Sequence, residues 1–117
     1  MTNLTCPPMH GDAASLARAL LTVPAHVRGL KAVEIVDRAK TAKIHVKCYG
    51  QCHPEYGNGS IMSAARLFAD LPPEPDFTDT DYIDCFIHAL QTLRALARAE
   101  ALSRGDVPED QVLEAAE

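Results

Sequence analysis

Apolar residues recur at helical spacing in this chain, and this periodicity constrains the fold more than any other feature. It is clearest in residues 80–104, where apolar side chains three or four positions apart predict one long amphipathic helix. The predicted buried face of this helix consists of Tyr82, Ile83, Phe86, Ile87, Leu90, Leu93, Ala97 and Ala101. Asp79 or Thr80 is suited to cap its start, and Gly105 is suited to follow its end.

The same spacing predicts three further helices. Residues 13–23 follow Asp12, a good N-cap residue, and end at Pro24. Residues 61–71 follow Ser60, another N-cap residue, and stop before two prolines. The predicted face of the first helix consists of Ala13, Leu16, Ala17, Leu20 and Val23.

The longest predicted helix spans residues 25–49. Its predicted inner face consists of Ala32, Ile35, Ala39, Ala42, Val46 and Tyr49. An alternative stays open for residues 43–49, because Ile44, Val46 and Cys48 alternate with polar residues as in a half-buried strand. We prefer the helix, since a lone strand needs a partner and no second strand pattern is present.

Length and composition then define the fold class. The 117 residues suffice for one hydrophobic core, and 47% of them are apolar, as in ordinary globular chains. Aromatic residues make up only 5% and Trp is absent, so alanine and aliphatic side chains must fill the core. We therefore predict an all-α domain, a compact bundle of about four helices over residues 1–105, with the helices at 25–49 and 80–104 as its spine. Residues 106–117 hold five acids and no base and are expected to form a mobile acidic tail.

The charge distribution excludes some classes of partner. The net charge is −5, so the chain lacks the basic footprint of a nucleic-acid-binding protein, and no apolar run is long enough to span a membrane. The N-terminus resembles no signal peptide, so we expect a cytoplasmic protein. Its four cysteines, Cys6, Cys48, Cys52 and Cys85, are then expected to be reduced thiols.

Histidine and cysteine residues form the first candidate site. His45 and Cys48 are three positions apart on a predicted helix, as are Cys85 and His88, and this spacing lets two side chains reach one metal ion. The full candidate zinc set is His45, Cys48, Cys52, His53, Cys85 and His88. No part of it matches a known zinc motif, so surface histidines and small apolar cysteines are the preferred interpretation.

The loop before the third predicted helix forms the second candidate site. Gly57, Asn58, Gly59 and Ser60 precede a helix start, where exposed N–H groups and the helix dipole favour an anion. The preceding strand and the lysine of a phosphate-binding loop are absent, so a tight turn followed by a Ser cap is the simpler interpretation.

Several segments resemble an uncharacterised family of short proteins from marine alphaproteobacteria. They are MHGD (9–12), LLTVP (20–24), HPEYGNGSIM (53–62), PEP (73–75) and DYIDC (81–85). The resemblance covers about residues 8–100 and implies one compact helical domain in a bacterial cytosol. It implies no activity and therefore assigns no functional residues.

Three functions remain as hypotheses. The first is a small binding or interaction module that uses an outward helix face to bind a protein partner or a second copy of itself. The second is a zinc-binding regulatory protein that uses the Cys/His set. The third is a small enzyme or anion-binding protein built around residues 53–60. We favour the first and expect neither catalytic residues nor a cofactor, because the sequence shows no nucleophile with its base and no clustered acid–base pair.

Overall fold

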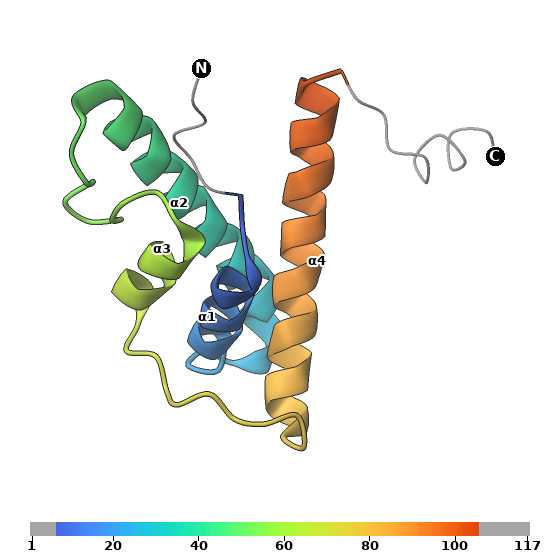
Figure 1. Cartoon of the computed structure of the whole chain (residues 1–117). Helices are drawn as coiled ribbons and strands as arrows, with labels where there is room; N and C mark the ends of the chain where they lie inside the picture. The colour runs from blue at the N-terminus through green and yellow to red at the C-terminus, as the bar shows by residue number, and fades with distance from the viewer. Residues whose placement is uncertain (1–6, 106–117) are drawn as a thin grey trace.

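The computed structural model describes residues 7–105, which form four α-helices and one short 3₁₀ helix (Figure 1). These elements are α1 (His10–Leu20), η1 (Ala25–Val27), α2 (Arg28–Tyr49), α3 (Ile61–Phe68) and α4 (Thr80–Ser103). The predicted all-α class is confirmed, and the strand alternative for residues 43–49 is wrong, because these residues lie within α2. The predicted acidic tail and Cys6 lie outside the described residues.

Helix α1 begins about one turn earlier than predicted. Its N-cap is Met9, and Asp12 is the third helical residue instead of the cap. The Asp12 carboxylate still serves the helix start, since its Oδ2 accepts a hydrogen bond of 2.9 Å from the Met9 N–H. The helix ends at Leu20, and Pro24 precedes η1, so the predicted helix end at residue 23 is three residues too late.

The predicted ends of the other helices are mostly confirmed. Helix α4 begins after Asp79, whose carboxylate accepts hydrogen bonds from two first-turn N–H groups, and Gly105 follows it with a φ of 87°. Ser60 caps α3 by accepting a hydrogen bond of 3.0 Å from the Ser63 N–H. Helix α3 ends at Phe68, before the predicted residue 71, because the chain becomes extended at Ala69.

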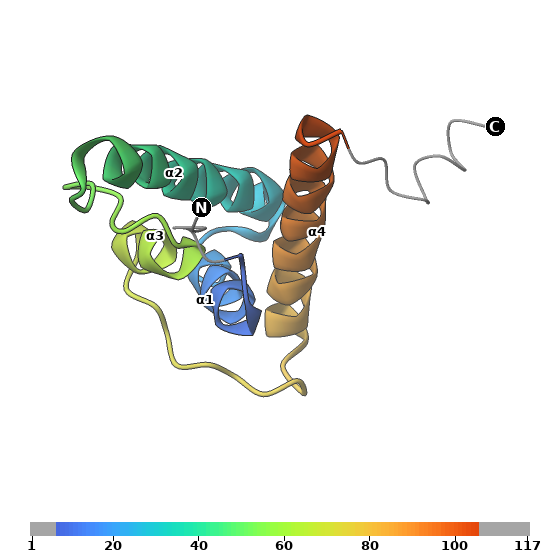
Figure 2. The ribbon, with the colours of Figure 1, turned by 45° about the horizontal axis from the view of Figure 1, so that its top comes forward.

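The short helix α1 lies at the centre of the fold. It packs against α3 on one side and α4 on the other, and α2 runs across both (Figures 1 and 2). The prediction that α2 and α4 form the spine is therefore wrong. An extended segment, residues 69–79, returns from α3 to the start of α4, and the Arg18 Nε holds it by donating to the Pro72 carbonyl at 2.7 Å.

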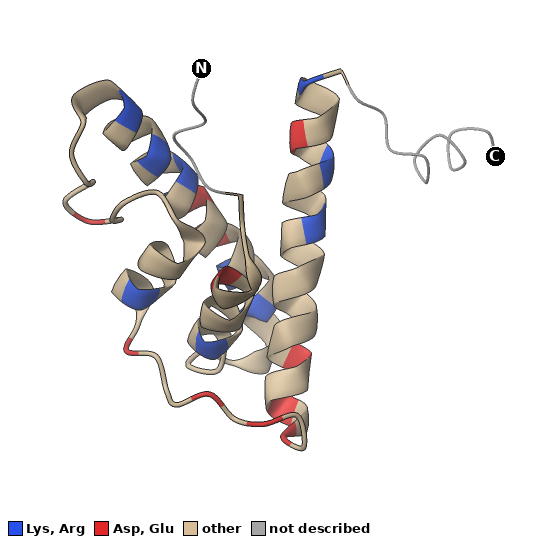
Figure 3. Ribbon diagram, viewed as in Figure 1, with Lys and Arg blue, Asp and Glu red and all other residues tan. Residues whose placement is uncertain are grey.

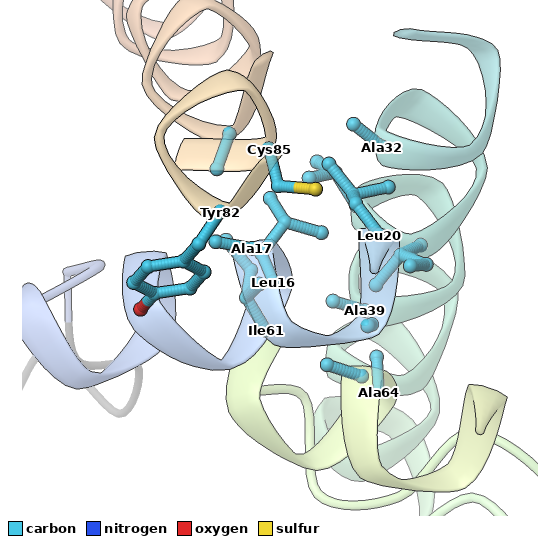
Figure 4. Packing of buried hydrophobic residues seen from close by; sticks show 14 residues of the cluster. Leu16, Ala17, Leu20, Ala32, Ala39, Ile61, Ala64, Tyr82 and Cys85 are labelled. Carbon is cyan, nitrogen blue, oxygen red and sulfur yellow. The ribbon is translucent and has the colours of Figure 1, made fainter. Parts of the chain in front are cut away.

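Small side chains allow this close packing. Leu16, Leu20 and Ile35 are fully buried, and Tyr82 and Cys85 of α4 close the cluster from the other side (Figure 4). Seven of the fourteen buried residues in the cluster are alanine: Ala17, Ala19, Ala32, Ala39, Ala64, Ala65 and Ala89. An alanine side chain has no rotamers, so its burial costs no side-chain entropy, and its small size lets helix backbones approach closely.

The buried face of α4 differs from the predicted one. The fully buried residues are Tyr82, Cys85 and Ala89, whereas Leu90 is 50% exposed and Ile87 is 47% exposed. The helix is rotated by roughly 90° relative to the prediction, at about 100° per residue. On α2 the predicted face is confirmed from Ala32 to Ala42, but Val46 is half-buried and Tyr49 is 70% exposed.

Candidate functional site

The six residues of the candidate zinc set divide into two groups at opposite ends of α2. His45 and His53 are in contact, with ring centroids 5.0 Å apart, and Cys48 and Cys52 near them are exposed. His88 lies at the other end, where its Nδ1 faces Gly29 in the first turn of α2. Sixteen residues of helix, about 24 Å, separate these ends of α2.

The two members of this set on α4 have other partners: Cys85 packs in the core, and His88 lies beside Asp84. Cys85 is fully buried in the core, and this burial raises the pKa of its thiol to about 11, which disfavours the thiolate that binds zinc. The His88 Nε2 lies 3.8 Å from an Asp84 carboxylate oxygen. Within residues 7–105, no group of three or more His, Cys, Asp or Glu side chains is placed to hold a metal ion.

The histidine of the 50–59 loop has a structural role. The His53 Nδ1 accepts hydrogen bonds of 3.0 Å from the N–H groups of Glu55 and Tyr56, and its ring stacks on the Tyr56 ring at 4.6 Å. Tyr56 in turn lies against the Arg38 guanidinium, which also covers the Phe68 ring. The Nδ1 lone pair is therefore used inside the loop.

The proposed anion cradle at residues 57–60 forms the tight turn of the simpler interpretation. Gly57 and Gly59 have φ angles of 90° and 100°, and Ser60 N–H donates to the Asn58 side chain at 2.9 Å. The Oδ1 of Asp12 accepts a hydrogen bond of 2.9 Å from the Met62 N–H in the first turn of α3. A carboxylate of this chain thus occupies the position where the dipole of α3 favours an anion.

A buried arginine, absent from the sequence-based candidates, joins three helix ends. Arg28 is 4% exposed, and its Nε donates to the Leu20 carbonyl at the end of α1. Its Nη1 lies 2.8 Å from the Asp81 carboxylate and 2.9 Å from that of Asp84, both in the first turns of α4. These hydrogen bonds raise the pKa of Arg28 and lower that of Asp81. The only sequence signal was the pair of acids three positions apart at a helix start.

Helices α2 and α4 diverge toward their C-terminal ends (Figures 1 and 2). A cleft of about 470 Å³ lies between α2 and the second half of α4. Its apolar lining includes Val36, Ile61 and Leu96, and Lys40 and Lys43 stand on its α2 wall. Ser60 also lines the cleft, and its hydroxyl oxygen accepts the capping hydrogen bond from the Ser63 N–H.

An exposed apolar surface lies along α4, on the side that the core does not use. We call it the outer seam and define it by six positions with alternating spacings of four and three residues. These positions are Ile83, Ile87, Leu90, Arg94, Ala97 and Ala101. All six are exposed or half-exposed, and Phe77, at 62% exposure, adds an aromatic ring beside the first turns by packing against Tyr82 and Phe86.

The fold and these surfaces define a small all-α domain in which one helix has an apolar face on each of two sides. The chain belongs to the family described as domain of unknown function DUF7742, whose profile matches residues 6–93. Comparison of this chain with the curated proteins and with the solved structures found no match. Across residues 7–105, no helix has the length and hydropathy needed to cross a bilayer.

Proposed function

We propose that this protein is a helical interaction module that binds a protein partner through the outer seam of α4. The observation that supports the proposal is the second apolar face of this helix. Its inner face, formed by Tyr82, Cys85 and Ala89 with flanking apolar residues, is already packed against the core. A helix that is apolar on two sides is typical of one covered on both.

The energetic basis of this proposal is the apolar area that the seam still exposes to water. Burying a leucine or isoleucine side chain completely contributes about 1.5–3 kcal/mol. Ile87 and Leu90 retain about half of their exposure, so each has on the order of 1 kcal/mol left to gain from a partner. Exposed apolar side chains that lie side by side along one helix are characteristic of protein-binding surfaces.

The two alternative functions receive less support. The zinc hypothesis finds no set of ligands among residues 7–105, because His45 and Cys85 belong to separate regions at the two ends of α2. The enzyme hypothesis would need a free imidazole lone pair on His53 as a base. The loop N–H groups of Glu55 and Tyr56 already use the Nδ1 lone pair, so the neutral ring carries its proton on Nε2. The resemblance to short alphaproteobacterial proteins supports a bacterial cytoplasm as the setting that we propose.

Site-specific photo-cross-linking in the native cells tests the interaction. A benzoylphenylalanine at position 90 should form protein adducts, while the same residue at position 102 should not. Leu102 is a matched control, because it lies on the same helix with 51% exposure but about 120° away from Leu90. The adduct at position 90 should disappear when Ile87 is replaced by lysine. Equal adducts at positions 90 and 102, or none at either, would contradict the proposal.

A further inference from the structure

The spacing of the outer seam specifies the geometry of its partner. Alternating steps of three and four residues give an average period of 3.5, which is the repeat of a helix that packs along a second helix. The seam runs from Ile83 to Ala101, a length of about 27 Å at 1.5 Å per residue. Its partner is therefore a helix of at least five turns.

The sizes of the seam residues differ between its two ends. The first half contributes Ile83, Ile87 and Leu90, whereas the second half contributes two alanines, Ala97 and Ala101. A partner that fits this surface needs small residues opposite the first half and large residues opposite the second, so that the facing layers interdigitate. The same sequence read in the opposite direction has that pattern.

Charge shows the same asymmetry. Acids occupy the first turns of α4, and arginines follow in its second half with one acid among them (Figure 3). The acids Asp81 and Asp84 retain side-chain exposures of 59% and 49% beside Arg28, and Arg94 is exposed within the seam. Antiparallel pairing of two α4 helices places the acidic first turns of one copy beside the arginine-containing second half of the other, whereas parallel pairing places the acidic turns side by side.

We propose that the partner is a second copy of this chain and that two α4 helices pair antiparallel along their outer seams. This inference rests on the proposed interaction function and names its partner. A twofold axis near Thr92 places Ile83 opposite Ala101 of the second copy, Ile87 opposite Ala97, and Leu90 opposite Arg94. Each large residue then faces a small one or the aliphatic stem of an arginine, whose guanidinium reaches water.

The extent of the seam sets the expected strength of this dimer. One helix pair of about 27 Å is at the lower end of specific interfaces, so the dimer should dissociate on dilution. The axis is a closed twofold, which yields discrete dimers instead of open chains. The inner face of α4 and the cleft beside α2 are not used, because Leu96 and Glu100 of the cleft point away from the seam.

Sedimentation velocity over a wide range of protein concentration tests the proposal, with four chains compared. Wild type should dimerise, and Leu90→Lys should raise the dissociation constant at least about tenfold, since its lysine faces Arg94 of the other copy. Leu102→Lys, the matched control, should behave as wild type. The double variant Leu90→Lys/Arg94→Glu should recover dimerisation, because each lysine then faces a glutamate. Circular dichroism should show wild-type helix content for all four.

Other occupants of the seam give different results. A wild-type chain that stays monomeric, with a lower melting temperature for Leu90→Lys, would mean that another segment of the same chain covers the seam, and this outcome overturns the proposal. A dimer that the double variant fails to restore overturns the antiparallel arrangement. Cross-links from position 90 to a different protein, with a monomeric chain in solution, refute self-association while the interaction function stands. Absence of both cross-links and dimers refutes both.

Discussion

Replacing Arg28 and replacing its two carboxylate partners should destabilise the fold to different extents. In Arg28→Met the aliphatic stem remains, and the Leu20 carbonyl at the end of α1 loses its guanidinium donor. The two carboxylates lose their cation but are about half exposed, so water replaces it. In the double variant Asp81→Asn/Asp84→Asn, the guanidinium keeps its charge at 4% exposure without a counter-charge.

The expected losses of unfolding free energy depend on which polar or charged group each substitution leaves buried without a partner. The methionine variant loses hydrogen bonds of a charged donor that water partly replaces, which costs about 1–2 kcal/mol. An arginine cannot lose its proton in a protein, so a stranded buried guanidinium costs about 3 kcal/mol, the lower end of the range for a broken buried pair. The triple variant, which removes charge from both sides, should recover part of that loss.

Urea denaturation monitored by circular dichroism measures these differences, provided that the slope with denaturant is unchanged between variants. We expect the free energy of unfolding to fall in the order wild type, Arg28→Met, double asparagine variant. If the methionine variant is as unstable as the double variant or more so, Arg28 acts through packing and the reasoning from stranded charge is refuted.

The same cluster predicts how stability depends on pH. The Arg28 hydrogen bond lowers the pKa of Asp81 in the folded state. The contribution of this pair to the free energy of unfolding is therefore complete above the pKa of Asp81 in the unfolded chain, about 3.9. It is lost as the pH falls through the folded pKa. Wild type should therefore lose more stability than Arg28→Met below about pH 4. Parallel acid titrations of the two proteins would contradict the assignment, since the other carboxylates are common to both.

Three further predictions concern the turn, the thiols and the tail. Gly59→Ala should cost about 1–3 kcal/mol of unfolding free energy, because φ is 100° and the new Cβ would lie 3.0 Å from the α2 backbone. The control Gly105→Ala, with φ of 87° and open space around it, should cost less in the same melts, and equal losses would refute the steric argument. Brief alkylation with mass mapping should label Cys48 and Cys52 in the folded protein and Cys85 only after unfolding; early labelling of Cys85 would show that the core is open. Truncation after Gly105 should leave the melting temperature nearly unchanged, whereas a fall of several degrees, about 1 kcal/mol for a domain of this size, would show that residues 106–117 dock.

Helix identity was predictable from the sequence because local periodicity determines it, and α2 and α4 are each within about three residues of the prediction. The rotation of α4 was not, since its apolar residues cover more than half of its circumference. Such a helix does not specify which part faces inward. The side of α4 with Cys85 and Ala89 faces the core, because its small side chains allow α1 to approach closely. The wider, bulkier stripe around Leu90 was left outside.

The long-range polar contacts were not predictable for a different reason. Arg28 meets Asp81 and Asp84 across 53 and 56 residues, and Asp12 meets Met62 across 50. Helix-dipole and capping effects act within one turn. They therefore predict that a carboxylate stabilises a helix start, but they do not predict which of the other helices that carboxylate contacts. Asp12 illustrates this, because it serves the starts of α1 and α3 together.

The central position of α1 has a consequence for the order of folding. An isolated helix of eleven residues is marginal in water, because the cost of nucleation is not recovered over so few turns. The surfaces that stabilise α1 belong to α3 and α4, whose first residues are synthesised about 50 and 70 residues after His10. During translation the first helix should therefore remain unformed until the first turns of α4 leave the ribosome, and the domain should then fold in one late, cooperative step.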